Sequence, residues 1–312
     1  MKVLSLFDGI SCGMVALERA GIPVERYVAY EIEPNAIKIS KKNYPQIEHC
    51  GDVTTADFTQ YRGFDLVMGG SPCQNMSTLG DRTGLDGEKS RLFFEFARAL
   101  DEAEPQFFLL ENNANMPRKD KEKITEILGV KPIEINSKIF VPQNRSRLYW
   151  IGKKTHKRHY DTVCIAIPQT EKSNLYEVIA GLCKKIDLVP FVLRKIPELE
   201  EKYGYLPKMF NPYNATEIKH IAPCLTAQGN SQTKSCSIIV NNRDGTFSMP
   251  NSAAHERLQT LPSGYTEGVP EGIRKSLIGN GWTVDVIAHI LKGLGCESCL
   301  NTYHQKNVGD CV

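Results

Sequence analysis

Residues 3–13 read VLSLFDGISCG: a short apolar run leads directly into a turn that contains two glycines. The run predicts a buried strand over residues 3–7, and the stretch 14–20 behind it predicts a helix. Glycines between a strand and a helix let the backbone turn tightly and approach a ligand closely. Their spacing is G-x-x-x-G and not the G-x-G-x-x-G of dinucleotide-binding proteins, so the turn predicts a ligand without a pyrophosphate.

The alternation of strand and helix continues outward from this stretch. Short strands separated by helices are typical of α/β proteins with a doubly wound, mostly parallel, Rossmann-like sheet. Ligands bind such sheets beyond the carboxyl ends of the strands. A last helical stretch at 273–291 is expected to pack back onto the sheet. The other expected strands lie at 27–32, 47–52, 64–68, 107–110 and 148–151, and the other helices at 34–42 and 92–102.

The alternation stops after residue 151. Residues 152–222 are irregular and carry 12 Lys and Arg against 8 Asp and Glu, which makes this segment basic. Two interpretations stay open: a solvated insertion, or a surface that meets phosphate. We expect a cofactor-binding domain formed by residues 1–151 and 268–312, and a smaller, irregular, mostly β domain at 152–267.

Composition and charge set outer limits. The chain has 312 residues, of which 41% are hydrophobic and 24% charged, as in ordinary globular proteins, and its net charge is +2. No apolar run approaches the roughly 18 residues of a membrane span, and no signal peptide is evident, so we expect a cytoplasmic protein without membrane contact. The ten cysteines are scattered. Only Cys296 and Cys299 have metal-ligand spacing, without a second pair, so we expect no metal site.

Acidic residues stand at the ends of two predicted strands. Glu31 comes 22 residues after Gly9, where an acid can accept hydrogen bonds from ribose hydroxyls. Asp52 ends the next strand and can accept from an adenine amino group. Together these residues suit a nucleoside cofactor without phosphates, such as S-adenosyl-L-methionine. The alternative is that they are ordinary turn residues at strand ends.

A cysteine stands in the loop after the strand at 64–68. Residues 69–75 read GGSPCQN, a sharp turn in which a buried structural cysteine is uncommon, so Cys73 is the candidate nucleophile. Glu111 follows the strand at 107–110, and Arg145 and Arg147 precede the strand at 148–151. A thiol, a carboxylate and two guanidinium groups at one sheet edge predict a reactive site. Taken singly, Glu111 is also explained as a helix N-terminal acid and the arginines as surface charges.

Six ordered blocks resemble the DNA (cytosine-5)-methyltransferase family. They read LFDG at 6–9, GSPCQ at 70–74, EN at 111–112, QNRSR at 143–147, RLQTLP at 257–262, and GN at 279–280 followed by Val284. The resemblance covers nearly the whole chain and thins only at 152–222. FDGI at 7–10 and the run from Gly87 through RLFFEF at 91–96 look most like the animal de novo enzymes, while we expect a bacterial or phage member of the family.

The resemblance implies an enzyme that transfers a methyl group from S-adenosyl-L-methionine to C5 of cytosine in a short sequence context of double-stranded DNA. Cys73 would attack C6 of a cytosine flipped out of the helix. Glu111 would contact N3 and the exocyclic amine. Arg147, with Arg145 in support, would hold the cytosine carbonyl or a flanking phosphate.

The resemblance also implies supporting and binding residues. Asn112 would buttress the loop that begins at Pro72, and the smaller domain would recognise the target sequence. The expected cofactor contacts are Phe7, Asp8, Gly9, Ile10, Glu31, Ile32, Asp52, Val53, Gly70, Asn280, Trp282 and Val284. The expected DNA contacts are Gln74, Asn75, Gln228, Asn230 and Arg243.

The chain departs from the family pattern at three places. Asn75 stands where Gly is usual, and Asn113 stands where a small aliphatic residue is usual. LTAQ at 225–228 occupies the block that usually contains Thr-Arg, so a supporting salt bridge is expected to be missing.

Alternative functions stay open at this point. Methylation of RNA cytosine is one, although the Cys-Phe-Thr triplet expected of that branch is absent from the sequence. An inactive DNA-binding regulatory subunit is another, although Cys73 and Glu111 are both present. A transferred group other than methyl is a third, suggested only by Asn113. The expected partner is double-stranded DNA in the nucleoid or in a phage-infected cell, with a cognate restriction endonuclease as a candidate, and the expected state is a monomer or weak dimer.

Overall fold

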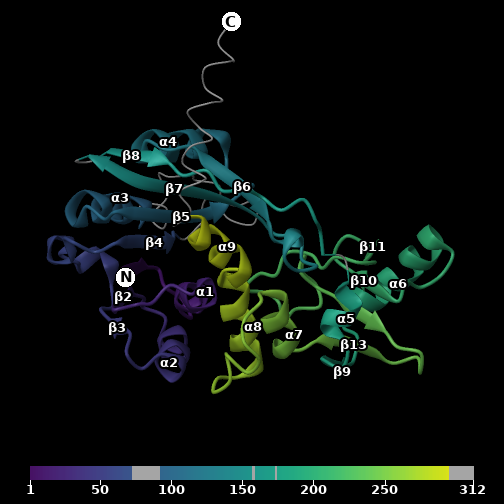
Figure 1. Ribbon diagram of the computed structural model, residues 1–312. Coiled ribbons are helices and arrows are strands. Elements are labelled where there is room, and N and C mark those ends of the chain that lie inside the picture. The colour runs from purple at the N-terminus through teal and green to yellow at the C-terminus, as the bar shows by residue number, and fades with distance from the viewer. Residues whose placement is uncertain (72–91, 157–158, 173, 295–312) are drawn as a thin grey trace, which may run out of the picture. The chain divides into compact units, whose positions relative to one another are not determined.

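The computed structural model describes residues 1–71, 92–156, 159–172 and 174–294 (Figure 1). The chain divides into two compact units. The first comprises Met1–Ile135, Ser146–Pro168 and Val286–Val312, and the second comprises Asn136–Arg145 and Gln169–Asp285.

The main sheet has the strand order β3-β2-β1-β4-β5-β7-β6, with β8 paired to β7. Strands β3, β2, β1, β4 and β5 are mutually parallel, and β7 pairs antiparallel with both β5 and β8. The strand order reverses beside β1, which is where doubly wound sheets bind ligands. The bounds are β1 (Lys2–Leu6), β2 (Arg26–Tyr30), β3 (Glu48–His49), β4 (Leu66–Gly70), β5 (Phe107–Asn113), β6 (Pro132–Asn136), β7 (Ser146–His156) and β8 (His159–Thr162).

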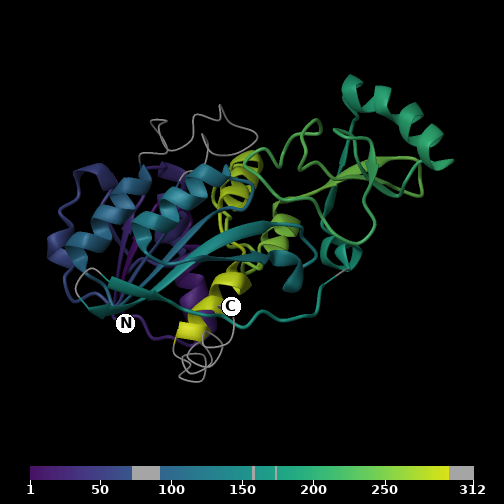
Figure 2. The ribbon, with the colours of Figure 1, turned by 90° about the horizontal axis from the view of Figure 1, so that it is seen from above.

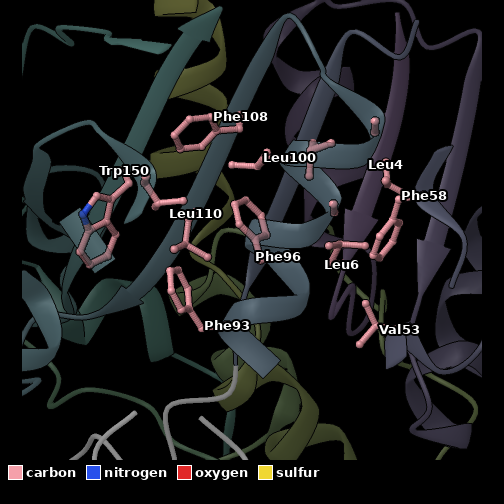
Figure 3. Packing of buried hydrophobic residues seen from close by; sticks show 14 of the residues in the cluster. Leu4, Leu6, Val53, Phe58, Phe93, Phe96, Leu100, Phe108, Leu110 and Trp150 are labelled. Atoms are coloured by element: carbon pink, nitrogen blue, oxygen red, sulfur yellow. The ribbon is translucent and has the colours of Figure 1, made fainter. Parts of the chain in front are cut away.

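Helices cover both faces of this sheet, and the blue helices α3 and α4 lie on the upper side of the strands in Figure 2. The apolar residues of α3 recur at helical spacing, and its Phe93 and Phe96 share one core cluster with Leu6, Leu110 and Trp150 of the strands (Figure 3). The bounds are α1 (Cys12–Ala20), α2 (Pro34–Asn43), α3 (Leu92–Ala103), α4 (Arg118–Leu128) and α9 (Val284–Leu294), with short 3-10 helices η1 (Val53–Thr55) and η2 (Phe58–Tyr61).

Two glycines permit close packing around β1. A Cβ atom on Gly13, in α1, would overlap the end of the Met68 side chain in β4, so the absence of a side chain at Gly13 lets Met68 pack there. A Cβ atom on Gly69 would lie 2.7 Å from the backbone oxygen of Leu6. Because its neighbour is a backbone atom, Gly69 limits how closely β1 and β4 come together at the switch in strand order.

The second unit holds a five-stranded antiparallel sheet in the order β11-β10-β12-β13-β9. Alternate residues of its strands face two separate clusters. Phe210 and Ile239 pack with α6, whereas Met209 and Val240 pack with α5 and α7. The bounds are η4 (Ser137–Ile139), α5 (Leu175–Ile179), β9 (Cys183–Ile186), α6 (Pro190–Tyr203), β10 (Met209–Asn211), β11 (Thr216–Glu217), β12 (Ile239–Asn241), β13 (Phe247–Pro250), α7 (Ser252–Leu258) and α8 (Glu271–Asn280).

The predicted fold class is confirmed: a mostly parallel α/β sheet is accompanied by a small antiparallel one. Two local predictions were wrong. Residues 152–222 are not irregular, because they include α6, a 14-residue amphipathic helix. The helical stretch at 273–291 is two helices, because α8 ends at Asn280 and α9 begins at Val284. The predicted functional division at 152–267 stays a prediction.

Candidate active site

The strands of the first unit bring their carboxyl ends to one edge of the sheet. Leu6 at the end of β1 is in register with both Tyr30 of β2 and Gly69 of β4. Gly70 is in register with Glu111 of β5. Residues that follow β1, β2 and β4 therefore lie at the same edge as the far end of β5, as expected for parallel strands.

A charged pair occupies the β5 side of this edge. Arg147 Nε lies 2.9 Å from Glu111 Oε1, and the two side chains are only 15% and 12% exposed. The pair forms because β5 and β7 run antiparallel, which sets Arg147 opposite Asn113 and two positions from Glu111. A second guanidinium nitrogen of Arg147 donates to the Ser146 oxygen at 2.8 Å. A carboxyl group and a guanidinium held together in this way can hydrogen-bond a planar ring on neighbouring atoms.

Asn112 directly follows Glu111 in β5, so its side chain points to the opposite face of the sheet. It is buried, and its Nδ2 donates to Ser71 Oγ at 3.1 Å, while its Oδ1 accepts from the Asn113 N–H at 2.8 Å. Asn112 therefore fixes the backbone two residues before Cys73. The predicted residues Pro72, Cys73, Gln74 and Asn75 lie outside the described residues, as do Cys296 and Cys299.

The glycine turn after β1 is held in an unusual conformation. Phe7, Gly9 and Ser11 all have positive φ, at 57°, 60° and 58°. The N–H of Gly9 donates to Glu31 Oε2 at 2.7 Å, and Glu31 Oε1 accepts the N–H groups of residues 32 and 33. The spacing of 22 residues noted in the sequence is thus a direct hydrogen bond. Glu31 uses three of about four acceptor positions internally, which leaves about one for a ligand hydroxyl.

Asp52, the second predicted acid, has more acceptor positions left for a ligand than Glu31. Both side-chain hydrogen bonds of Asp52 within the described part of the chain are accepted by Oδ1, from the N–H and hydroxyl of Thr54, and the residue is exposed. Its Oδ2 can therefore accept from an amino group. Ile32, directly after Glu31, is 69% exposed and offers an apolar surface at the same edge. This donor and acceptor set fits a nucleoside cofactor.

The predicted cofactor contacts differ in which of their atoms can face a ligand. The side chains of Ile10, Val53 and Val284 are buried, so only their backbone atoms can face a ligand. Phe7 is half-buried against the core cluster, and Gly70 ends β4 in register with Glu111. Asp8 turns its carboxylate toward Ser11 and Tyr27. In the second unit, Asn280 is exposed and Trp282 is half-buried.

Arg145 differs from its sequence-based interpretation, because the second unit uses it as an internal anchor. It is 5% exposed, and its guanidinium donates to the backbone oxygens of Leu225, Gly279 and Gly281 at 2.7–3.3 Å. With its donors directed at carbonyls, Arg145 ties together three segments of its own unit. Within the block at 225–228, the contact that Arg145 makes is to the Leu225 backbone oxygen.

Two buried glutamines complete this anchor and were missed as functional residues. Gln143 donates to the Leu258 oxygen and accepts from the Leu225 N–H, and Gln259 donates to the oxygens of residues 278 and 281. Thr283 donates to Gln259 Oε1 at 2.6 Å. We call Gln143, Arg145, Gln259 and Thr283 the polar anchor. Its signal in the sequence is that the blocks at 143–147 and 257–262 both contain a Gln.

The predicted DNA contacts that lie within the described residues are exposed. Gln228 and Asn230 stand in a loop after β11, and Arg243 stands in the turn between β12 and β13. Asn230 also accepts a hydrogen bond from the buried Lys275 at 3.4 Å. Among the described helices, none is long and apolar enough to cross a membrane.

Comparisons with known proteins connect this geometry to a family. A family profile described as C-5 cytosine-specific DNA methylase matches residues 1–296. Orphan methyltransferase M.SPRI of Bacillus phage SPR is 36% identical over 164 residues, which cover 49% of this chain and 37% of the relative. Type II methyltransferase M.NgoBV of Neisseria gonorrhoeae is 30% identical over 228 residues, which cover 65% of this chain and 52% of the relative. The chain spans about a third to a half of the length of these curated relatives.

Solved structures agree in fold. The Entamoeba histolytica methyltransferase EhMeth has a TM-score of 0.71 at 16% identity, over 94% of this chain and 97% of its own. A putative DNA modification methyltransferase encoded within an Escherichia coli prophage has a TM-score of 0.67 at 20% identity, over 96% and 99%. At these identities the likeness shows the fold.

Proposed function

The chain belongs to the C-5 cytosine-specific DNA methylase family, and we propose that it transfers a methyl group from S-adenosyl-L-methionine to C5 of cytosine in double-stranded DNA. The observation that carries the proposal is the ion pair of Glu111 and Arg147 at the carboxyl edge of the parallel strands. It stands beside β4, the strand that leads into the Pro72-Cys73 loop. The pair offers a carboxyl group for N3 and the exocyclic amine of cytosine and a guanidinium for its carbonyl oxygen.

In the proposed reaction the Cys73 thiolate adds to C6 of a cytosine that has left the base stack. Negative charge then accumulates at N3 and O2 of the ring. Glu111 holds a proton at N3, Arg147 donates to O2, and C5 becomes nucleophilic as a result. After C5 is methylated, a base removes its proton and the Cys73 thiolate leaves.

The cofactor site in this proposal is the edge formed by Gly9, Glu31, Ile32 and Asp52. When bound, S-adenosyl-L-methionine supplies an electrophilic methyl group. Glu31 would accept from a ribose hydroxyl with its remaining lone pair, and Asp52 Oδ2 would accept from the adenine amine. Ile32 would cover the apolar face of the base.

Arg145 takes a different part in the proposal from the one its motif suggests. It is a positioning residue, since its donors bond backbone oxygens rather than pointing into solvent. Target recognition is assigned to the exposed residues Gln228, Asn230 and Arg243, with a short site because few side chains are available to read base edges.

The wider setting is also a proposal. Relatives carry the names orphan methyltransferase, in phages, and type II methyltransferase, in Neisseria and Lactococcus. A cognate restriction endonuclease is therefore a candidate partner, and an endonuclease gene beside the gene for this chain would support it. We propose action on DNA in the cytoplasm or an infected cell, as a monomer or weak dimer, which sedimentation with and without DNA tests.

Bisulfite sequencing tests the proposed activity. Unmethylated duplex DNA is incubated with the full chain and S-adenosyl-L-methionine, and protected cytosines in one short context are expected. Cys73→Ala should abolish protection. Absence of protection by a folded protein that binds the cofactor would overturn the duplex-DNA proposal and favour RNA as substrate or an inactive DNA-binding subunit. Methylation assays on RNA then separate those two.

A further inference from the structure

A continuous row of side-chain hydrogen bonds runs inward from the glycine turn of the first unit. Ser11 Oγ donates to Asp8 Oδ2 at 2.5 Å, and Ser11 Oγ lies 2.6 Å from Ser40 Oγ. Ser40 Oγ lies 3.0 Å from His49 Nε2. Both serines are fully buried, Ser40 lies in α2, and His49 ends β3. The row therefore joins the turn after β1 to a residue that lies three positions before Asp52.

The first donor in this row is fixed by Asp8. Its Oδ1 accepts a second hydroxyl, from Tyr27 at 2.6 Å, and the Ser5 hydroxyl also bonds the carboxylate. Desolvation by burial raises the pKa of Asp8, and the three hydroxyl donors partly oppose this shift. Asp8 accepts from Tyr27 at Oδ1 and from Ser11 at Oδ2, so Ser11 uses its single proton on Asp8.

The remaining donors then follow one by one. Ser11 has no proton left for Ser40, so Ser40 donates to Ser11. Ser40 in turn has no proton left for His49, so the Nε2 of His49 must carry a proton and donate to Ser40. The row thus has one direction, from His49 to Asp8.

The second ring nitrogen of His49 is consistent with this direction. Among the described residues, the buried Nδ1 has no hydrogen-bond partner. With the proton on Nε2, Nδ1 is an unfilled acceptor; with the proton on Nδ1, it would be a buried N–H without a partner, which folded proteins avoid more strongly. Burial and the charge of Lys41 lower the pKa of His49, so the ring is mostly neutral at pH 7.

We propose that His49 is a positioning residue for the cofactor turn, and that the proton on its Nε2 orients Ser40 and Ser11 and so holds the turn in its left-handed conformation. Ser11 has φ of 58°, which a residue with a side chain adopts only when its surroundings hold it there. The same turn presents Gly9, whose N–H fixes Glu31. The inference rests on the proposed function, because that turn is the one assigned to S-adenosyl-L-methionine.

The position of the proton is tested without cofactor and without activity. Nitrogen-15 NMR of the histidine-labelled full chain at pH 7.5, assigned with His49→Gln, distinguishes the two neutral tautomers. We expect the Nε2–H tautomer for His49. The Nδ1–H tautomer, or a doubly protonated ring, would overturn the inference and leave the methyltransferase proposal standing.

Cofactor affinity tests the positioning effect. His49→Gln keeps an N–H donor near the position of Nε2, whereas His49→Leu removes it. We expect the dissociation constant of S-adenosyl-L-methionine to rise about 5- to 10-fold in His49→Leu and in Ser40→Ala, the scale of one lost hydrogen bond, and to stay within about twofold in His49→Gln. The KM for the cofactor should follow, with kcat within about twofold.

A histidine outside the row provides the control. His289 is half-buried and its Nε2 lies 2.7 Å from the Ala166 oxygen, so His289→Leu should leave cofactor affinity unchanged. Equal affinities in His49→Leu and His49→Gln would overturn the positioning role. If His49→Leu does not fold, the cofactor affinity of Ser40→Ala and the tautomer of His49 still test the positioning role. If the parent chain does not bind S-adenosyl-L-methionine, the proposed function fails, and the tautomer alone still tests the row.

Discussion

Arg145 and Arg147 stand two residues apart in one motif, yet the chain uses them in opposite ways. Arg147 pairs with the carboxylate of Glu111 at the edge of the main sheet, and both side chains keep some exposure. Arg145 is buried in the second unit and bonds three backbone oxygens. The partners therefore separate the two roles. A charged side chain paired at a sheet edge suits chemistry, whereas a buried guanidinium that bonds three backbone oxygens suits architecture.

The largest expected effect is at the sheet edge. Glu111→Gln should lower the rate of cytosine methylation by about 10²–10⁴-fold, the range for removing a positioned acid–base group. The protein should still fold and bind the cofactor, because Glu111 belongs to neither the polar anchor nor the glycine turn. Single-turnover methylation of a defined duplex measures the rate, and a change below about threefold would contradict the assigned role.

The two arginines allow a direct test of the comparison. Arg145→Met should lower the free energy of unfolding by about 3–5 kcal/mol, because three backbone oxygens each lose a hydrogen bond from a buried guanidinium. Arg147→Met should lower it by only about 1–2 kcal/mol, since Glu111 keeps contact with water, while methylation is lost. Urea unfolding followed by circular dichroism measures the stability of both variants. If Arg147→Met lost more stability than Arg145→Met, the assignment of Arg145 to architecture and Arg147 to chemistry would be wrong.

The polar anchor also depends on a glycine. A Cβ atom on Gly279 would lie 2.1 Å from the backbone oxygen of Thr226, so Gly279→Ala should cost about 3 kcal/mol of stability through overpacking. Gly272 lies in the same helix, and the nearest atom to its Cβ position is 3.5 Å away on the side chain of Asn230. Gly272→Ala should therefore be neutral or stabilising. Equal losses in thermal unfolding would show that helix α8 is simply intolerant of alanine.

A smaller expected effect is a pH dependence of stability that comes from His255 in the second unit. Burial and Lys275 lower the pKa of His255 to about 3, below the value of about 6.5 in the unfolded chain. Between pH 6.5 and about pH 3, His255 is protonated in the unfolded chain but neutral in the folded chain. Protonation therefore stabilises the unfolded chain, and the free energy of unfolding decreases as the pH falls through this range. From pH 7.5 to pH 5.0 we expect a loss of about 1–2 kcal/mol from this residue. His255→Phe should flatten the urea-unfolding profile by that amount, and an unchanged slope would contradict it.

The sequence predicts much of the sheet edge, because its residues follow strands at short range. The acid 22 positions after Gly9 and the pair Glu111-Asn112 after an apolar run could be placed from strand ends alone. The break between α8 and α9 was missed because apolar periodicity continues across Gly281–Thr283. Helix α6 was missed because a charged stretch that contains two prolines resembles a loop, although Pro190 at its start is favourable and Pro197 is tolerated inside it.

The role of Arg145 and the row from Asp8 to His49 could not be predicted for a different reason. The oxygens that bond Arg145 belong to residues 80–136 positions away along the chain. His49 meets Asp8 only through two serines on separate elements. Neither contact follows from residue type or local spacing, so both require the tertiary structure.

Covalent trapping on DNA that carries 5-fluorocytosine tests the central claim most directly. Fluorine at C5 cannot be removed as a proton is, so an enzyme that adds a thiolate to C6 and methylates C5 remains attached to the DNA. We predict that the full chain with S-adenosyl-L-methionine forms such a complex, that mass spectrometry locates the bond at Cys73, and that Glu111→Gln forms it at least about 100-fold more slowly. Methylation of ordinary cytosine without any trapped complex, or a complex through another cysteine, would contradict the account.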